Sequence, residues 1–288
     1  MRSSKQRNQR ITRSTFGNVM IALILIGAGL FTILPLIYSI STSLKPLDEI
    51  LAFPPRFFVT RPTGQNYAAL PGLLNSLRVS AERYFINSIM LSVVINIGHV
   101  FIAAMAAYVF TQSKSRFMKV AFTIVQFTIL FNGYTLAIPQ YMIFSGMKII
   151  DTYLVYILPA LPSTIGVFLI KQFMDASLPP ALIEAAKIDG AGNFRIFFTV
   201  VMPIAKPALL TLALFAFRDA WALVPSGTIF RDELRTLPQV MGQITGGGIA
   251  RSGSAMAATV LLMIPPIAVY LLCQSNVLET MSNAGIKE

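Results

Sequence analysis

The residues that could do chemistry in this sequence are few and far apart. Its 288 residues include one cysteine, Cys273, and one histidine, His99, which lies in an apolar stretch where a packed, hydrogen-bonded residue is favoured over a proton relay. A single cysteine forms neither an intrachain disulfide nor a cysteine-based metal site. The sequence contains no Gly-x-x-x-x-Gly-Lys-Ser/Thr phosphate loop and no cluster of acid, base and nucleophile. We therefore predict no catalytic residues, no metal site and no cofactor bound by this chain, which is not expected to be an enzyme.

A charged pair, Arg218 and Asp219, interrupts an apolar stretch, and Trp221, the only tryptophan, follows within a turn. Charges inside a membrane span are costly and often functional. Neighbours in sequence point about 100° apart on a helix, so each charge is expected to find a separate partner. The pair either lines a translocation path or forms a buried contact between helices. Trp221 could stack on a sugar ring, but we favour a position at the membrane interface.

The longest stretch expected on the cytoplasmic side, 171–206, carries a bent helical element. Pro179 and Pro180 suit a helix start, and residues 181–189 have high helix propensity. Gly190 is expected to end this helix, and a second short helix follows it. Small residues at the turn and one apolar side make a compact projection that a partner protein could grip.

Membrane helices must position these residues, because the composition indicates a lipid environment. The chain is 55% hydrophobic and 12% charged, against about a quarter charged in soluble domains. One apolar stretch, 207–230, contains only the Arg218 and Asp219 charges near its middle. Together with five charge-free stretches, it predicts an all-α integral membrane protein with six transmembrane helices. The other five stretches lack Asp, Glu, Lys and Arg, and each is long enough to cross a bilayer: 14–44, 84–113, 120–147, 152–170 and 252–278.

Basic residues predict the orientation. The N-terminal tail and the 111–119 turn carry basic residues without acids, and such segments stay in the cytoplasm. Six spans return the C-terminus to the same side. The predicted organisation is a basic cytoplasmic tail over 1–18, a six-helix transmembrane domain over 19–278 that includes the 171–206 loop, and a cytoplasmic tail over 279–288. The net charge of +11 reflects residues that flank the spans, so nucleic acid is not an expected partner.

The outer segments are rich in residues that disfavour helix. Segment 45–83 contains five prolines, so we expect an ordered but irregular cap. Segment 227–253 contains six glycines and is expected to be a loop. Its run Gly246, Gly247 and Gly248 could enter a narrow cleft of another protein, or it is a flexible linker.

Spaced residues in the 171–206 loop resemble a known family. Glu184-Ala185-Ala186 is followed by Asp189-Gly190-Ala191 and then by Pro203 and Lys206-Pro207. This set is similar to the EAA loop of bacterial ABC-importer permeases, which has Glu-Ala-Ala, then glycine, then a proline near the next membrane helix. Shorter matches, similar to the sugar-importer branch that includes the maltose permeases, run along the chain: Leu34-Pro35-Leu36, Ser43-Leu44-Lys45, Asn66-Tyr67, Asn87-Ser88, Ala107-Tyr108, Pro139-Gln140-Tyr141 and Gly285-Ile286-Lys287.

The resemblance implies the type I ABC importer permease fold, in the bacterial inner membrane. In that family the EAA element is a coupling helix held in a cleft of a cytoplasmic ATPase. The resemblance also implies a second homologous permease, two ATPase subunits that use ATP and Mg, and a sugar or oligosaccharide as cargo. An extracytoplasmic solute-binding protein would contact the loop with Gly246, Gly247 and Gly248. The coupling residues would be Glu184, Ala185, Ala186, Asp189, Gly190 and Ala191.

Where the family often has Trp-Asn, this chain has Trp221-Ala222, which puts a direct sugar hydrogen bond from the second position in doubt. A permease of the same family for a non-sugar solute stays open, because partner proteins could supply most of the selectivity. A secondary transporter usually needs dedicated intramembrane carboxylates, whereas Asp219 stands nearly alone. A membrane enzyme would need a catalytic cluster that the sequence lacks.

Overall fold

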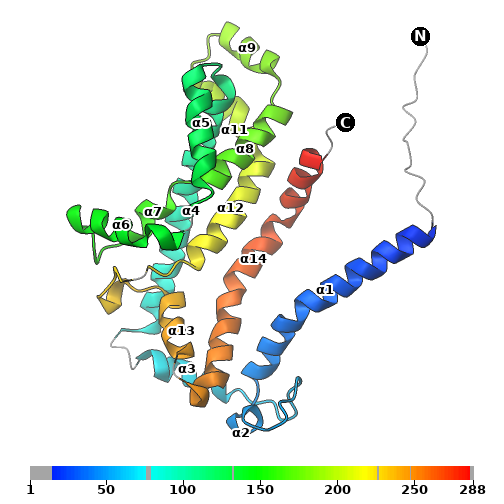
Figure 1. The fold of residues 1–288 in the computed structure, drawn as a ribbon, viewed down its shortest axis with the longest axis vertical. Helices are drawn as coiled ribbons and strands as arrows, with labels where there is room; N and C mark the ends of the chain where they lie inside the picture. The colour runs from blue at the N-terminus through cyan, green and yellow to red at the C-terminus, as the bar shows by residue number, and fades with distance from the viewer. Residues whose placement is uncertain (1–14, 76–78, 132, 226, 247, 286–288) are drawn as a thin grey trace.

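The computed structural model describes residues 15–75, 79–131, 133–225, 227–246 and 248–285 (Figure 1). Most of the predicted N-terminal tail and the end of the predicted C-terminal tail lie outside these ranges. Within them the regular structure is helical, without strands. The elements are α1 Thr15–Ser43, α2 Leu47–Ile50, α3 Gln65–Asn75, α4 Ala81–Gln112, α5 Arg116–Thr128, α6 Gly133–Gly146, α7 Leu154–Ala160, α8 Thr164–Ser177, α9 Pro180–Ile188, α10 Asn193–Ile196, the π-helix η1 Phe197–Val201, α11 Met202–Ile204, α12 Lys206–Trp221, the 3₁₀-helix η2 Asp232–Leu234, α13 Leu237–Thr245, the 3₁₀-helix η3 Ile249–Arg251 and α14 Ser252–Gly285.

In the described residues, four of the six spans predicted by composition, or five if a bent pair counts as one, are helices long and apolar enough to cross a membrane. The four are Phe16–Ser43, Ala81–Gln112, Leu154–Ser177 and Ser252–Gln274. The pair Asn193–Ile204 and Lys206–Trp221, bent by 81°, makes a fifth if it is one span. The stretch 120–147, predicted as one helix, is divided into α5 and α6, and α6 runs across the direction of α5 (Figure 1). Turn bonds from Ile129 N to Gln126 O and from Leu130 N to Phe127 O tighten the chain where α5 ends.

Helix α12 lies at the centre of the bundle and packs against α4, α8 and α14. Close packing around it depends on small residues. Ala103, Ala104 and Ala107 of α4 are fully buried, which lets neighbouring helices approach. A Cβ at Gly166 of α8 would lie 2.8 Å from Leu212 Cδ2 of α12, so a side chain there would force the two helices apart.

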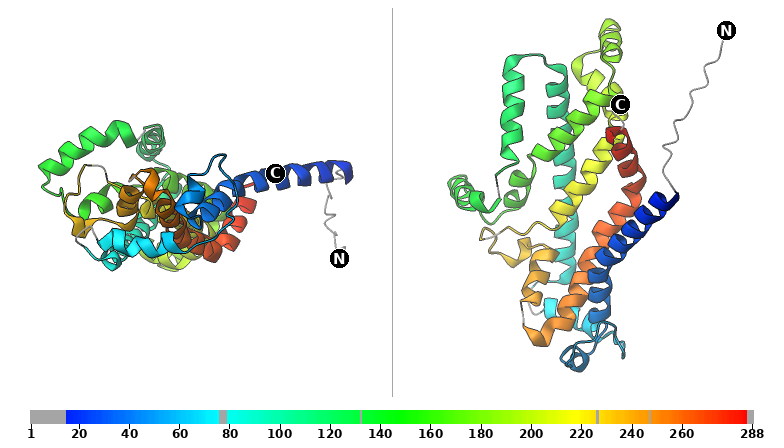
Figure 2. Two further views of the ribbon diagram at one scale, coloured as in Figure 1. Left: turned by 90° about the horizontal axis from the view of Figure 1, so that it is seen from below. Right: turned by 45° about the vertical axis from the view of Figure 1, so that its right-hand side comes forward.

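Helix α1 diverges from the other helices along most of its length (Figures 1 and 2). It contacts α14, but the apolar window that qualifies it as a span contains no buried residue. Large apolar side chains such as Phe16, Leu23 and Phe31 are exposed along it. A surface of this kind suits lipid or another membrane protein rather than water.

The two ends of the molecule carry different elements. Helix α9 and the C-terminal end of α14 lie toward one end, whereas α2, α3 and α13 lie at the other (Figure 1). The outer segment after α2 is irregular, as its prolines predict, and buried charged side chains hold it. Lys45 Nζ donates to Arg56 O at 2.5 Å, and Glu49 Oε1 accepts from Thr60 N at 2.8 Å.

Both outer segments nevertheless contain more helix than composition predicts. Helix α3 continues through Pro71, and α13 forms within the stretch expected to be a loop. Val240, Met241 and Ile244 of α13 are buried in a cluster with residues of α3, α4, α12 and α14. Tertiary packing of this apolar face therefore outweighs the local effect of the glycines.

Candidate functional site

Helix α9 forms the predicted projection from the 171–206 loop. It begins at Pro180, the first helical position, where the missing N–H of proline costs nothing. It ends at Gly190, whose φ of 78° lies in the left-handed region that favours glycine. Gly190 N donates to Lys187 O and Ala191 N donates to Ala186 O, both at 3.0 Å, which is the hydrogen-bond pattern of a Schellman turn.

The surface of α9 offers a mainly exposed face to a partner. Ile183 is buried and anchors the helix, while Glu184, Ala185, Asp189 and Gly190 are exposed. The nearby apolar side chain of Ile188 is 86% exposed. The predicted coupling residues are thus brought together on one short, projecting helix and its turn, with Ala186 and Ala191 half-buried at its base.

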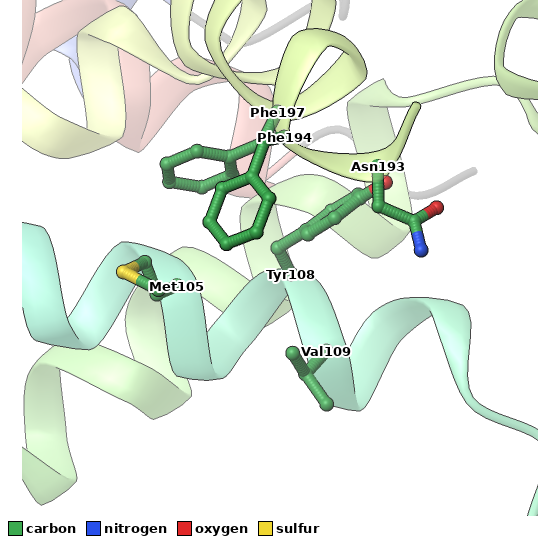
Figure 3. Close-up of a pocket in the computed structure, with 6 residues that line it drawn as sticks. All are labelled: Met105, Tyr108, Val109, Asn193, Phe194 and Phe197. Carbon is green, nitrogen blue, oxygen red and sulfur yellow. The ribbon is translucent and has the colours of Figure 1, made fainter. Parts of the chain in front are cut away.

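An aromatic cluster joins this projection to the membrane helices. Ile196, Phe197 and Val201 are buried in the same core as α4, α8 and the start of α12. The ring centroid of Phe197 lies 5.6 Å from that of Tyr108 and 6.3 Å from that of Phe101 on α4. A shallow apolar pocket of about 130 Å³ adjoins the cluster, where Tyr108, Phe194 and Phe197 lie close together (Figure 3).

Arg218 and Asp219 bond to each other, so the expectation of separate partners is wrong. Arg218 Nε and Nη2 lie 2.9 and 2.8 Å from Asp219 Oδ1. The guanidinium also lies 5.7 Å from the ring centroid of Phe215. The two side chains are 62% and 67% exposed, so the pair is not a buried contact between helices of this chain.

The exposed pair opens on two cavities. The first, the polar chamber, has a volume of about 450 Å³ and is lined by residues that include His99, Thr128, Thr164, Arg218 and Asp219. It lies beside the break between α7 and α8, where Pro162 interrupts the helix. The second, the apolar chamber, has a volume of about 570 Å³ and is lined by residues of α1, α12, α13 and α14. Arg218 lines both chambers.

Trp221 is buried within the bundle, so the preferred interface position is wrong. Its exposed fraction is 4%, its Nε1 donates to Leu262 O at 3.0 Å, and its ring is stacked on that of Phe217. The hydrogen bond links α12 to α14, and it satisfies the only polar atom of the buried indole. The aromatic surface that remains contributes to the wall of the apolar chamber.

His99 is a packed and hydrogen-bonded residue, as favoured. Its Nδ1 lies 2.7 Å from Ala160 O at the end of α7. A carbonyl oxygen only accepts, so Nδ1 carries the hydrogen of this bond. This bond ties α4 to the broken span beside the polar chamber.

The outer loop after α12 is fixed to α4 and α7 at several points. Asn87 Nδ2 donates to Glu233 O at 2.8 Å, and Tyr156 OH donates to Leu234 O at 3.1 Å. Helix α13 follows this anchored stretch and leads to Gly246 and Gly248, which are exposed. Gly247 lies outside the described residues. The glycine run therefore follows a rigid base, although the sequence alone predicts a loop throughout.

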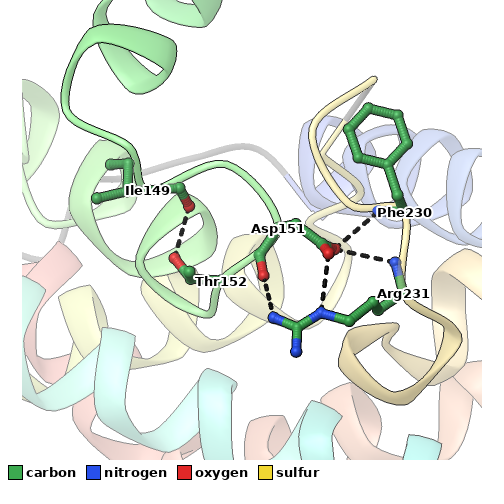
Figure 4. A network of polar contacts seen from close by, with 5 residues as sticks. All are labelled: Ile149, Asp151, Thr152, Phe230 and Arg231. Atoms are coloured by element: carbon green, nitrogen blue, oxygen red, sulfur yellow. Dashed lines mark hydrogen bonds and ion pairs between the residues drawn. The ribbon is translucent and has the colours of Figure 1, made fainter.

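Asp151 and Arg231 form a clamp that sequence reasoning missed (Figure 4). Asp151 Oδ1 accepts from Phe230 N at 3.0 Å and from Arg231 N at 2.9 Å, and Oδ2 lies 2.8 Å from Arg231 Nε. Burial raises the pKa of Asp151, but the backbone hydrogen bonds and the Arg231 guanidinium outweigh it and bring the pKa below its ordinary value of 3.8. The clamp joins the connection between α6 and α7 to the loop after α12.

The comparison with known families decides the identity of this arrangement. Residues 99–278, well over half of the chain, match the family described as binding-protein-dependent transport system inner membrane component. This chain belongs to that family. It is a permease subunit of a binding-protein-dependent ABC importer, and it is a component of the inner membrane.

Named relatives of the permease cover much of its length. It is 30% identical over 196 residues to the sn-glycerol-3-phosphate transport system permease protein UgpE of Shigella flexneri, covering 67% of this chain and 69% of that protein. It is 25% identical over 268 residues to the inner membrane ABC transporter permease protein YcjP of Escherichia coli, covering 91% and 94% of the two chains. These relatives are transport subunits rather than enzymes.

A solved structure shares the fold of the permease. A chain from a bacterial ABC transporter involved in the import of the acidic polysaccharide alginate superposes with a TM-score of 0.71 and covers 95% of this chain and 99% of that one. Their sequences are 21% identical, so this likeness shows the fold alone. Among the described residues of the permease, no group of three or more His, Cys, Asp or Glu could hold a metal ion.

Proposed function

We propose that the permease forms, with a second homologous permease, the membrane pathway for a sugar or oligosaccharide, and that α9 couples this pathway to a cytoplasmic ATPase. The observation that carries the proposal is the projecting helix with Glu184, Ala185 and Gly190 exposed at its tip. A carboxylate there can make a charge-assisted contact, and the small residues let a partner surface come close. Asp189, Ala186 and Ala191 complete this contact surface.

The packing around α9 supports transmission of force to the bundle. The buried side chains of Ile196, Phe197 and Val201 connect the projection to α4 and α8, and the bent chain then continues directly into α12. Interfaces of packed side chains move as units rather than deforming continuously. A displacement of α9 by an ATPase would therefore move the helix that carries Arg218 and Asp219.

We further propose six membrane crossings, with α9 and both termini on the cytoplasmic side. The crossings are α1, α4, α5 with α6, α7 with α8, α10 through α12, and α14. The position of α9 and the end of α14 toward the same end of the molecule supports this topology (Figure 1). The tails would then be 1–18 and 279–288, with the transmembrane domain and its 171–206 coupling loop between them.

The proposed assembly contains two ATPase subunits, which use ATP and Mg, and an extracytoplasmic solute-binding protein. The binding protein would contact the loop at Gly246, Gly247 and Gly248, because its base on α13 is firmly held and its tip is exposed. Nucleic acid has no place in this assembly, since the basic residues flank the spans. Arg218, Asp219 and Trp221 are the proposed residues of the solute path.

The proposed cargo is a sugar. Both the sequence resemblance to the sugar-importer branch and the name of UgpE, which transports a phosphorylated polyol, point to polyhydroxylated solutes. A different solute carried by a permease of the same family is the alternative. A secondary transporter is a poor alternative, because the family is a component of binding-protein-dependent transport.

Charge reversal at the coupling helix tests the proposed function. Glu184→Lys, in the importer reconstituted in vesicles with its own ATPase and binding protein, should weaken ATPase association about tenfold, since a charge-assisted contact becomes repulsive. Gly190→Leu should abolish ATP-dependent uptake, because a branched side chain is strained at a φ of 78°.

The matched control is Glu82→Lys, the same reversal at an exposed position at the start of α4. It should leave ATPase association unchanged. Unaltered ATPase assembly and uptake in both the Glu184 and Gly190 variants would refute coupling through α9.

A further inference from the structure

The Arg218–Asp219 pair indicates which side of α12 meets water. Both side chains are more than half exposed, at the end of a helix that stops about halfway along the molecule (Figure 1). Contact of an exposed ion pair with hydrocarbon costs several kcal/mol. The pair therefore faces water or the polar groups of a partner rather than lipid, and the two chambers that share Arg218 are the spaces that adjoin it in this chain.

The charges on the wall of the polar chamber cancel. The positive charge of Arg218 is paired with the negative charge of Asp219, and Nδ1 of His99 is bonded to Ala160 O. The described residues that line the chamber include no other ionisable side chain. An anionic solute would lose its hydration shell there without gaining an uncompensated positive charge.

The two threonine hydroxyls on the chamber wall offer acceptors. Thr128 Oγ1 donates to Val125 O at 2.7 Å, so the hydrogen in its 2.9 Å contact with Thr164 comes from Thr164. Both hydroxyl oxygens are left with lone pairs, as is Asp219 Oδ2. Acceptors of this kind bind the O–H hydrogens of a solute and repel carboxylate or phosphate oxygens.

We propose that the polar chamber is a solute-binding site for uncharged, polyhydroxylated molecules, and that the Arg218–Asp219 pair keeps it neutral while supplying both donors and acceptors. This inference rests on the proposed transport function and narrows its substrate class. The volume of about 450 Å³ is within the usual range for small-molecule sites. Arg218, at the wall shared with the apolar chamber, contacts solute that passes between the two.

Thiol labelling tests the chamber independently of ATPase coupling. In the complete importer with Cys273→Ser, Ile165→Cys places a thiol on the chamber wall, since Ile165 lines it and is 64% exposed. The probes are methanethiosulfonate reagents that carry a sulfonate or a trimethylammonium group, applied with and without ATP and vanadate. The matched control is Ile124→Cys, at a similarly exposed apolar position of α5 that does not line the chamber.

The expected rates follow from the charge of the pair. Relative to a free thiol, both reagents should modify Ile165→Cys at similar rates, whereas Ile124→Cys should be unreactive. Adding Arg218→Gln should favour the cationic reagent by about fivefold, and adding Asp219→Asn should favour the anionic one by about fivefold. Maltose should slow modification at least about threefold, and sn-glycerol-3-phosphate should not.

Two results would overturn the inference. One is failure of either reagent to reach Ile165→Cys in any nucleotide state, which would remove the chamber from the solute path. The other is protection by sn-glycerol-3-phosphate but not by maltose, which would assign an anionic substrate. Loss of uptake in a Glu184 variant, with the labelling of Ile165→Cys unchanged, would bear only on the coupling through α9. The coupling proposal and the chamber proposal can therefore fail independently.

Discussion

At the scale of single residues, charges in this permease are stabilised by backbone groups as much as by opposite charges. Glu49 accepts from the backbone N–H groups of Thr60 and Arg61, and Asp151 accepts from those of Phe230 and Arg231. Hydrogen bonds to a charged acceptor are stronger than those between neutral groups. Irregular outer segments therefore acquire a fixed shape without extensive secondary structure.

Asp151→Asn should loosen the outer face. Asp151 has a φ of 62°, a conformation that asparagine also tolerates, so the change removes the charge without straining the backbone. We expect a loss of about 1 kcal/mol and a thermal midpoint about 2 °C lower in detergent solution. Arg83→Gln, at an exposed position on the same face, should have no measurable effect.

The same clamp predicts a dependence on acidity. The pKa of Asp151 in the folded protein is lower than in the unfolded chain, so the unfolded chain takes up its proton first as pH falls. The stabilisation is complete above about pH 4 and is lost as the pH drops through the folded pKa. As the pH is lowered through this range, the thermal midpoints of the parent protein and of Asp151→Asn should converge. A difference between the two midpoints that stays constant with pH would contradict the clamp.

At the scale of elements, the proposed coupling depends on the link between α9 and α12. It consists of α10, the π-helix η1 and α11, followed by the bend of 81° into α12. Single π-turns often occur at functional positions because they redirect side chains within a helix. Here the π-helix directs Phe197 and Val201 into the core while Phe194 and Phe198 remain exposed.

Phe197→Ala should uncouple ATP hydrolysis from transport. Its ring is buried between Phe101 and Tyr108, and truncation leaves a cavity that costs about 3 kcal/mol. A loosened link should reduce the solute imported per ATP hydrolysed while the ATPase still assembles. Phe194→Ala, at a side chain that is 71% exposed, is the matched control and should preserve the ratio. Phe197→Leu should recover most of it, whereas equal losses in Phe197→Ala and Phe194→Ala would argue against the link.

At the scale of the whole molecule, one permease chain leaves much apolar surface uncovered. Helix α1 stands apart from the bundle (Figure 2), and the Arg218–Asp219 pair is open to cavities rather than enclosed. An isolated subunit with these features suits a larger assembly, because exposed charges and long apolar helices need different surroundings.

Two glycines at opposite ends of the molecule test the proposed topology. A Cβ at Gly64 or Gly192 would meet no atom within 4 Å, so cysteine should be tolerated at either position. In the Cys273→Ser background, Gly64→Cys should react with a membrane-impermeant thiol reagent on intact spheroplasts. Gly192→Cys should react only in inverted vesicles. Labelling of Gly192→Cys from outside would reverse the orientation.

The sequence by itself determined the class of protein and the short helix of its 171–206 loop. Charge-free stretches indicate membrane helices because moving a charged side chain from water into lipid is unfavourable at each position, whatever its neighbours are. The helix at 180–188 and its end at Gly190 were predictable, since propensity, proline at the first turn and a glycine in the left-handed region act within a few residues.

Only the tertiary structure decided the features that join distant residues. Asp151 and Arg231 are 80 residues apart, and nothing local to either indicates the clamp. The position of Trp221, the packing of α13 and the chambers beside Arg218 likewise depend on which helices become neighbours. Burial and hydrogen bonding of a side chain are set by all the elements around it, whereas sequence patterns report mainly on the few residues along one helix.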